Sequence, residues 1–203
     1  MSLKCGIVGL PNVGKSTLFN CLSNAKAQSA NFPFCTIEPN IGTISVPDPR
    51  LEKLESLVNP ERVIPTTMEI LDIAGLVKGA SKGEGLGNKF LANIRETDAI
   101  LHVLRCFDDG NIVHVDGSVD PVRDKEIIDI ELQLKDLESI EKKISSLSRI
   151  IKSGDKVAVK ENELAHKIQD ALEQSQSVRT IDFSDEEYVI VRQFNLITIK
   201  PVM

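Results

Sequence analysis

The stretch Gly9-Leu10-Pro11-Asn12-Val13-Gly14-Lys15-Ser16 decides the fold that we expect for this chain. It has the spacing G-x-x-x-x-G-K-[ST], in which glycines let the backbone curl so that successive N–H groups face phosphate oxygens. The apolar run at residues 3–8 is typical of a buried strand, and residues 16–22 are typical of a helix. A strand, this loop and a helix N-terminus in sequence predict a site for a nucleoside phosphate.

The residues of this loop have separate expected roles. Lys15 brings a positive charge to the β- and γ-phosphates and is therefore a catalytic candidate, and Ser16 offers its hydroxyl to Mg²⁺. The alternative is a glycine turn between a strand and a helix that binds nothing. We predict that the nucleotide is held by Asn12, Val13, Gly14, Lys15, Ser16 and Thr17.

The composition limits the class of protein. The 203 residues suffice for one core of ordinary size with one insertion. The net charge of -6 argues against a protein that coats nucleic acid, although a local basic patch is compatible with it. The cysteines form no C-x-x-C pair, so we expect reduced thiols and neither a zinc site nor disulfides. Without a signal sequence or a bilayer-spanning apolar run, we expect a soluble cytoplasmic protein with no membrane partner.

Two later segments complete the expected site. Residues 66–73 are typical of a strand and lead into Asp72-Ile73-Ala74-Gly75, a D-x-x-G pattern. A carboxylate at this strand end suits Mg²⁺, and Gly75 lets a backbone N–H approach the γ-phosphate. Thr36 is the best-placed threonine to close over the metal, the alternative being a solvent-facing residue in a turn. The predicted metal ligands are Ser16, Thr36 and Asp72.

The residue after Gly75 is unusual for a nucleotide switch. Ras-like switches place a glutamine there to orient the attacking water, whereas this chain has Leu76, which cannot hydrogen-bond to water. Either hydrolysis is slow, or another group or a partner positions the water. The glycine-rich residues 77–88 are expected to be mobile, as a nucleotide-dependent switch or as a plain surface loop.

The remaining pattern of the first part predicts further elements of an α/β fold. We expect a strand at 41–46, a short helix at 50–57, a helix at 89–96 and a strand at 99–107. His102 in the last strand is better explained as a core or sheet-end residue than as a catalyst. His114, in the following loop, carries no catalytic signal of its own.

The second part predicts a helical hairpin. Apolar residues recur at three- and four-residue steps over 124–152, in the pattern of a coiled coil, at Ile127, Ile130, Leu134, Leu137, Ile140, Ile144, Leu147 and Ile151. A turn at 153–155 and a second helix through 172 follow. The acidic base and basic tip are either two solvated faces or an arm whose tip contacts RNA phosphates. The tip residues are Lys142, Lys143, Arg149, Lys152, Lys156 and Lys160.

The end of the chain predicts a return to the sheet. Residues 185–192 are typical of a helix and 196–203 of the next strand, within which the chain stops, so we expect a fragment that lacks the last part of its nucleotide domain. The expected fold is α/β, a mostly parallel P-loop sheet with an inserted antiparallel helical hairpin. The expected parts are a nucleotide-binding domain at 1–120, the hairpin at 121–180 and the return at 181–203.

Three motifs together resemble the Obg-like ATPase (YchF) family. They are Gly9 to Ser16, Asn31-Phe32-Pro33-Phe34-Cys35-Thr36-Ile37-Glu38-Pro39-Asn40, and Asp72-Ile73-Ala74-Gly75-Leu76-Val77-Lys78-Gly79-Ala80. The resemblance implies a ribosome-associated P-loop protein with a coiled-coil insertion, a C-terminal TGS domain and a preference for ATP over GTP. It accounts for Leu76, and it implies that His114 is the catalytic residue that orients or deprotonates water.

Some of the implied features lie outside this sequence. The N-x-x-E motif for adenine would follow Met203, so an Obg-class GTPase, with N-K-x-D there, remains an alternative. A nucleotide-gated ribosome- or RNA-binding module without catalysis is a second alternative. Asn12 matches relatives in which an asparagine oxygen helps to hold K⁺ near the phosphates, so K⁺ joins Mg²⁺ as an expected cofactor.

Overall fold

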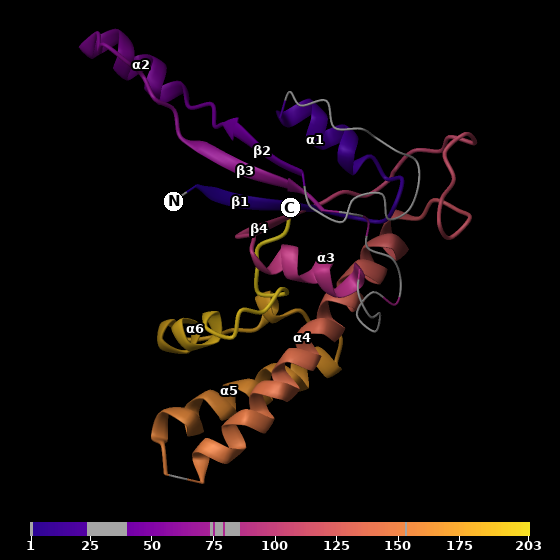
Figure 1. Cartoon of the computed structure of the whole chain (residues 1–203), viewed down its shortest axis with the longest axis vertical. Coiled ribbons are helices and arrows are strands. Elements are labelled where there is room, and N and C mark those ends of the chain that lie inside the picture. Colours follow the sequence, from indigo (N-terminus) through magenta and orange to yellow (C-terminus); the bar gives the residue numbers. More distant parts are fainter. Residues whose placement is uncertain (1, 24–39, 74, 76–78, 80–85, 153) are drawn as a thin grey trace.

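The structure is a computed structural model that describes residues 2–23, 40–73, 75, 79, 86–152 and 154–203 (Figure 1). The strands are β1 Leu3–Val8, β2 Asn40–Ser45, β3 Thr67–Asp72 and β4 Ala99–His102. The helices are α1 Lys15–Ser23, α2 Pro49–Val58, α3 Leu86–Arg95, α4 Pro121–Ile151, α5 Lys156–Glu173, the 3-10 turn η1 Val178–Thr180 and α6 Asp185–Arg192. No helix within these ranges is long and apolar enough to cross a membrane.

The four strands form one sheet in the order β2-β3-β1-β4 (Figure 1). β1 pairs in parallel with both β3 and β4, and β2 pairs antiparallel with β3. The predicted α/β class and mostly parallel sheet are therefore confirmed. Because parallel strands end at the same edge of a sheet, the segments that follow β1, β3 and β4 meet at one edge.

Side chains alternate between the two faces of the sheet, and both faces are covered. Ile7 and Ile70 pack with Phe19 of α1. Their neighbours Val8 and Leu71 belong to a second cluster, which includes residues of α3 and α4. Successive strand residues point to opposite faces, so these adjacent apolar residues serve two cores. Figure 1 shows α1 and α3 on opposite sides of the sheet.

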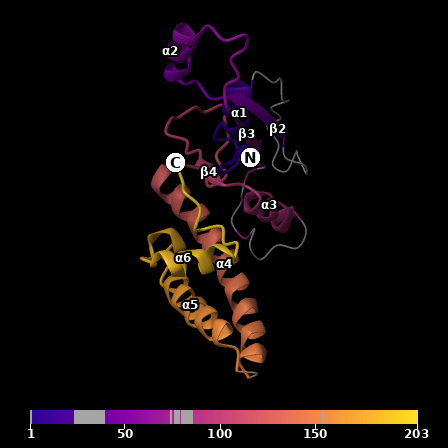
Figure 2. The same cartoon turned by 90° about the vertical axis from the view of Figure 1, so that its left-hand side faces the viewer.

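Helices α4 and α5 lie side by side and antiparallel, and they extend away from the sheet (Figures 1 and 2). Asp120 caps α4 by accepting hydrogen bonds from the next backbone N–H groups, and Pro121 occupies the first turn. Asp155 caps α5 in the same way. The hairpin has its own core, in which Ile140 packs with residues of α5 and α6 such as Ile168.

The apolar stripe predicted for α4 is right toward the tip and at Ile127, which packs against the core, but it is wrong at two positions between them. Ile140 is buried as predicted, but Ile130 and Leu134 are 47% and 37% exposed. Ile128 and Leu132 are buried in their place, within the core cluster that covers the sheet. The first half of α4 packs against the core that covers the sheet, and its second half packs against α5. The buried face of the helix therefore changes along its length, and a single apolar stripe does not describe it.

The strand predicted over 196–203 is wrong for most of its length. Only the last three residues pair with β4, around Ile100. The backbone N–H groups of Ile197 and Thr198 donate instead to the carboxylate of Asp136 on α4, at 2.9 and 2.7 Å. Because a fully buried carboxylate occupies these donors, they are not available for a strand ladder.

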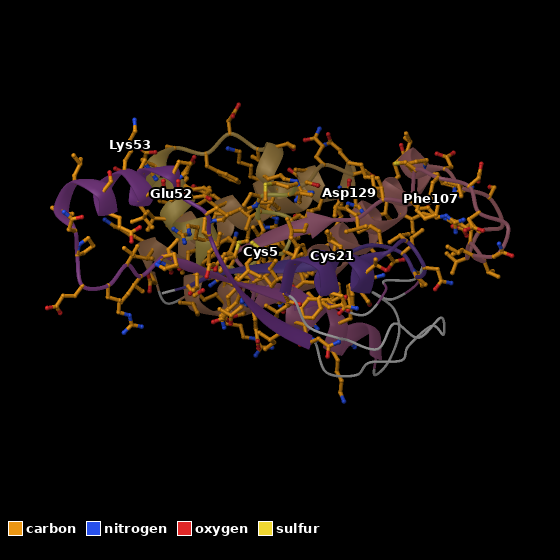
Figure 3. All side chains as sticks on the ribbon, turned by 90° about the horizontal axis from the view of Figure 1, so that it is seen from above. Cys5, Cys21, Glu52, Lys53, Phe107 and Asp129 are labelled. Carbon is orange, nitrogen blue, oxygen red and sulfur yellow. The ribbon has the colours of Figure 1, made fainter. Side chains whose placement is uncertain are left out.

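Helix α2 forms where it was predicted but contributes nothing to the core. Asp48 caps it, and none of its residues is buried. Figure 3 shows its residues Glu52 and Lys53 at the opposite end of the molecule from Phe107, which lies in the loop after β4. Leu54 and Leu57 on the apolar face of α2 are 53% and 78% exposed, so this face adds no side chain to the core. This helix is therefore remote from the edge where the site forms.

The Asp136→Ala substitution is expected to lower the free energy of unfolding by about 2–3 kcal/mol. It leaves two buried backbone N–H groups without an acceptor, at a cost of about 1–3 kcal/mol each, partly offset by the removal of a buried charge. Urea unfolding of the chain measures the change. The control is Glu126→Ala, an exposed acid on the same helix, which should stay within about 0.5 kcal/mol of the parent. Equal stability of the two variants would contradict the role given to Asp136.

Candidate nucleotide-binding site

The loop between β1 and α1 has the backbone that its glycines allow. Gly14 has φ 101° and Asn12 has φ 61°, both in the left-handed region. At Gly9, a Cβ atom would lie 2.4 Å from the carbonyl oxygen of Val103, so only glycine lets the loop pass this close to the chain after β4. Val13 is buried in the core, and Thr17 is exposed at the start of α1. The buried Val13 therefore fixes the loop to the core, while Thr17 leaves the start of α1 exposed to solvent.

Lys15 is the buried cation of this loop. Its side chain lies at the first position of α1, and Nζ donates a hydrogen bond to the carbonyl oxygen of Leu10 at 2.7 Å. Burial lowers the pKa of Lys15 to about 8, although the negative charge of Asp72 acts in the opposite direction. An ammonium held inside its own phosphate-binding loop is suited to exchange the carbonyl for phosphate oxygens.

Ser16 and Asp72 lie side by side, as their predicted shared role as metal ligands requires. The Ser16 hydroxyl donates to Oδ2 of Asp72 at 2.7 Å. Parallel pairing creates this contact, because Asp72 is the register partner of Ile7 and so ends its strand beside the loop. Burial raises the pKa of Asp72, while the bond from Ser16 and the charge of Lys15 oppose the rise. A hydroxyl and a carboxylate oxygen so placed fit Mg²⁺, which prefers oxygen ligands.

Gly75 packs directly against the phosphate-binding loop. A Cβ atom there would lie 2.9 Å from the backbone nitrogen of Pro11 and 3.0 Å from its Cγ. Any side chain would therefore push the D-x-x-G segment away from the loop. Thr36, Leu76 and most of the glycine-rich segment 77–88 lie outside the described residues, so their predicted roles stay predictions.

The loop after β4 is built around Arg105. The strand predicted to reach residue 107 ends at His102. Beyond it the buried guanidinium of Arg105 donates to the carbonyl oxygens of Phe107 at 3.0 Å, Asp109 at 3.1 Å and Ile112 at 3.0 Å. These bonds curl the chain away from the sheet, which is why the strand is shorter than the apolar run suggests.

His114 in this loop is buried, and both of its ring nitrogens are bonded. Nε2 lies 2.8 Å from Oδ2 of Asp124, in the first turns of α4. The backbone N–H of Asp116 donates to Nδ1 at 3.2 Å. The side chains of His114 and Asp124 are 4% and 1% exposed. The histidine is therefore fastened to α4 in this structure, with no nitrogen turned to solvent.

Asn12 links the phosphate-binding loop to the histidine loop. Its Nδ2 donates to the carbonyl oxygen of Val113 at 3.2 Å, next to His114. The structure thus brings Asn12, Lys15, Ser16, Asp72 and Gly75 together at one edge of the sheet. It places His114 in an adjoining loop, in which the preceding residue, Val113, accepts the hydrogen bond from Asn12.

The basic residues predicted at the hairpin tip fall into two groups. Lys142, Lys143 and Lys160 form ion pairs with Glu138, Glu161 and Glu186. Arg149, Lys152 and Lys156 are exposed and form no ion pair with any other described residue. The cationic surface at the tip is therefore narrower than the sequence suggests.

Sequence reasoning missed the acids of α4 that reach the nucleotide loops. Asp124 holds His114, and Oε1 of Glu131 accepts a hydrogen bond from the backbone N–H of Gly79 at 2.5 Å. Both carboxylates are buried, whereas the sequence places them in a run of acids typical of a solvated face. The one available signal is their spacing of seven residues, which puts them on the same side of a helix.

Nucleoside triphosphate binding at pH 8 is expected to take up a proton. With its pKa at about 8, Lys15 is about half neutral in the free protein, and triphosphate charges favour its ammonium form. The affinity should therefore fall as the pH rises above about 8. Calorimetric titration with Mg²⁺-ATP in two buffers of different ionisation enthalpy measures the uptake.

The matched variant for this titration is Lys15→Arg, whose guanidinium stays charged over the same pH range. It should show no proton uptake at the concentrations where it binds. Identical binding enthalpies of the parent protein in both buffers would contradict a partly neutral Lys15.

Comparison with known proteins identifies the family of this chain. Residues 4–159 match the family model described as 50S ribosome-binding GTPase. The chain is 55% identical to the ribosome-binding ATPase YchF of Bacillus subtilis and 56% identical to that of Escherichia coli O157:H7, over 203 residues in both cases. These alignments cover 100% of this chain and 56% of each relative, so the chain spans about half the length of the relatives it matches.

A solved structure agrees with the sequence comparison. The Schizosaccharomyces pombe YchF GTPase superposes with a TM-score of 0.79 at 42% identity, over 100% of this chain and 55% of that one. The resemblance inferred from the three sequence motifs is therefore confirmed. The chain belongs to the 50S ribosome-binding GTPase family, among relatives that carry the YchF name.

Proposed function

We propose that the protein is a Mg²⁺-dependent nucleotide hydrolase that prefers ATP to GTP and acts as a ribosome-associated switch in the cytoplasm. The observation that carries the proposal is the contact of Ser16 with Asp72 beside the buried Lys15. This is the arrangement needed to hold a triphosphate and its metal at the end of a parallel sheet. The preference for ATP rests on the resemblance and on relatives whose names contain ATPase.

Each group has a separate task in this proposal. The amides of the loop from Asn12 to Thr17 bind the phosphates, and Lys15 neutralises charge that develops on them. Ser16, Asp72 and Thr36 hold Mg²⁺, whose charge stabilises the phosphate oxygens when it is bound. Gly75 lets its backbone N–H approach the γ-phosphate. His114 orients or deprotonates the attacking water in place of the glutamine that Leu76 replaces.

K⁺ is the second cofactor of the proposal. Nδ2 of Asn12 donates to Val113, which leaves Oδ1 of the same amide as the end that can face a cation. An amide oxygen is a suitable ligand for a monovalent cation near the phosphates. Such a cation would supply charge that an arginine supplies in other enzymes.

The partner surface of the proposal is the tip of the hairpin. Residues 1–120 bind the nucleotide, residues 121–180 form the arm, and residues 181–203 return to the sheet. The exposed Arg149, Lys152 and Lys156 contact the phosphates of ribosomal RNA, while Lys142, Lys143 and Lys160 play a smaller part because acids already pair with them.

Hydrolysis of ATP by the protein at its natural length is the first test. Ser16→Ala and His114→Ala are each expected to lower turnover about 100-fold, the first by loss of a metal ligand and the second by loss of the group that handles water. His114→Ala should retain nucleotide affinity. Replacement of K⁺ by Na⁺ should lower turnover in the parent protein.

The outcomes of this test separate the alternatives. Faster turnover with GTP would favour an Obg-class GTPase. Very slow turnover in the parent, with ribosome association intact in His114→Ala, would favour a non-catalytic module in which the nucleotide only sets the shape of the arm. Equal turnover in K⁺ and Na⁺ would remove the proposed cation site at Asn12 alone.

A charge reversal of Arg149, Lys152 and Lys156 to glutamate tests the arm. Binding to purified ribosomes should weaken at least tenfold. The plot of log association constant against log salt concentration should also become less steep by about 2, since each phosphate contact contributes about 0.7–0.9 to the magnitude of its slope. The matched control changes Lys142, Lys143 and Lys160 to glutamine and should weaken binding less. If the first variant keeps both the affinity and the salt slope of the parent, the tip is not the contact surface.

A further inference from the structure

The contacts of His114 identify which form of its ring is present. A backbone N–H, that of Asp116, points at Nδ1, and a backbone N–H can only donate. Nδ1 is therefore the unprotonated nitrogen. The proton is on Nε2, which donates to the carboxylate of Asp124. The bonds to the two sides of the ring thus select one of its two neutral tautomers.

Asp124 is itself rigidly placed. It lies in the first turns of α4, and its backbone N–H donates to the carbonyl oxygen of Asp120 at 2.9 Å. Its Oδ1 accepts from the guanidinium of Arg123 at 3.1 Å, which leaves Oδ2 for His114. The helix N-terminus further favours a negative charge at this position. The carboxylate therefore has a fixed direction and is not a mobile surface acid.

The residue before His114 is bonded to the phosphate-binding loop. The carbonyl oxygen of Val113 accepts from Asn12, so the residue preceding His114 is tied to the nucleotide site. The ring of His114 is thus bonded to the first turns of α4, while the residue before it is bonded to the phosphate-binding loop. This is the arrangement of a base whose orientation is set by a buried carboxylate.

We propose that Asp124 is the positioning residue of His114: it keeps the ring in the Nε2–H tautomer, so that Nδ1 is the nitrogen that accepts from the attacking water. The inference rests on the proposed role of His114 in hydrolysis. Asp124 acts only through the histidine and touches no reacting atom. The Asp116 N–H holds Nδ1 until a water replaces it, while the bond from Nε2 to Asp124 persists.

The ring tautomer is measured first, by nitrogen-15 NMR of histidine-labelled protein at its natural length. His114 is assigned by the signals that His114→Ala removes. The parent should show an unprotonated Nδ1 and a protonated Nε2. In Asp124→Leu, which is similar in size but offers Nε2 no acceptor, the Nε2–H form should lose its preference and the Nδ1–H tautomer should become populated. An unchanged tautomer in that variant would overturn the proposal.

Turnover then tests whether Asp124 acts through His114. Asp124→Ala is expected to lower the rate of ATP hydrolysis at least tenfold with nucleotide affinity retained, and to lower it no further in the His114→Ala background. Glu126→Ala, an exposed acid in the same part of α4, should match the parent. Unfolding midpoints establish that each variant is folded, and Asp124→Leu replaces Asp124→Ala if the latter is not.

The results distinguish this inference from the function on which it rests. A loss of activity in His114→Ala but not in the Asp124 variants would refute only the positioning role. Equal losses from Asp124→Ala with and without His114 would show that the carboxylate acts by another route. Full activity of His114→Ala would refute the proposed catalytic histidine, and with it the catalytic meaning of the tautomer.

Discussion

Three buried carboxylates on α4 determine how the parts of this molecule fit together. Asp124 accepts from the histidine loop, Glu131 from Gly79, and Asp136 from the segment that returns to the sheet. Each is at least 95% buried. A buried carboxylate without donors costs several kcal/mol, so each of these acids requires its donor segment to be in place. Helix α4 is therefore both the first helix of the arm and the support for the loops beside the nucleotide site.

Local patterns were sufficient to predict the four strands β1 to β4 and the position of Lys15, Ser16 and Asp72 at one edge of the sheet. Lys15, Ser16 and Asp72 follow from two short motifs, because parallel strands bring their carboxyl ends together whatever else the chain does. The helices at the end of the chain were equally accessible. Ser184 and Glu187, for example, form a capping box at the start of α6, and that pattern is visible in the sequence.

Features that depend on distant partners could not be predicted. The stripe on α4 was misassigned at Ile130 because the helix changes packing partners along its length, and periodicity does not indicate which surface lies opposite. Residues 196–200 have the composition of a strand, but the Asp136 carboxylate, about 60 residues earlier, takes their backbone donors. Asp124 and Glu131 looked like solvated acids, since no local feature distinguishes an exposed carboxylate from a buried one with a donor. The catalytic assignment of His114 came from the family resemblance alone.

The two bonds of His114 differ enough in strength to decide which one opens. The contact at Nδ1 is a neutral N–H bond at 3.2 Å, of a type that contributes about 1 kcal/mol. The contact at Nε2 is made to a carboxylate at 2.8 Å, and such charge-assisted bonds contribute about 1.5–3 kcal/mol. Exchange of the Asp116 N–H for a water is therefore the cheaper change, while release from Asp124 would leave a buried carboxylate with less support. Nδ1 is therefore the ring nitrogen that can be released to accept from a water, while Nε2 stays bonded to α4.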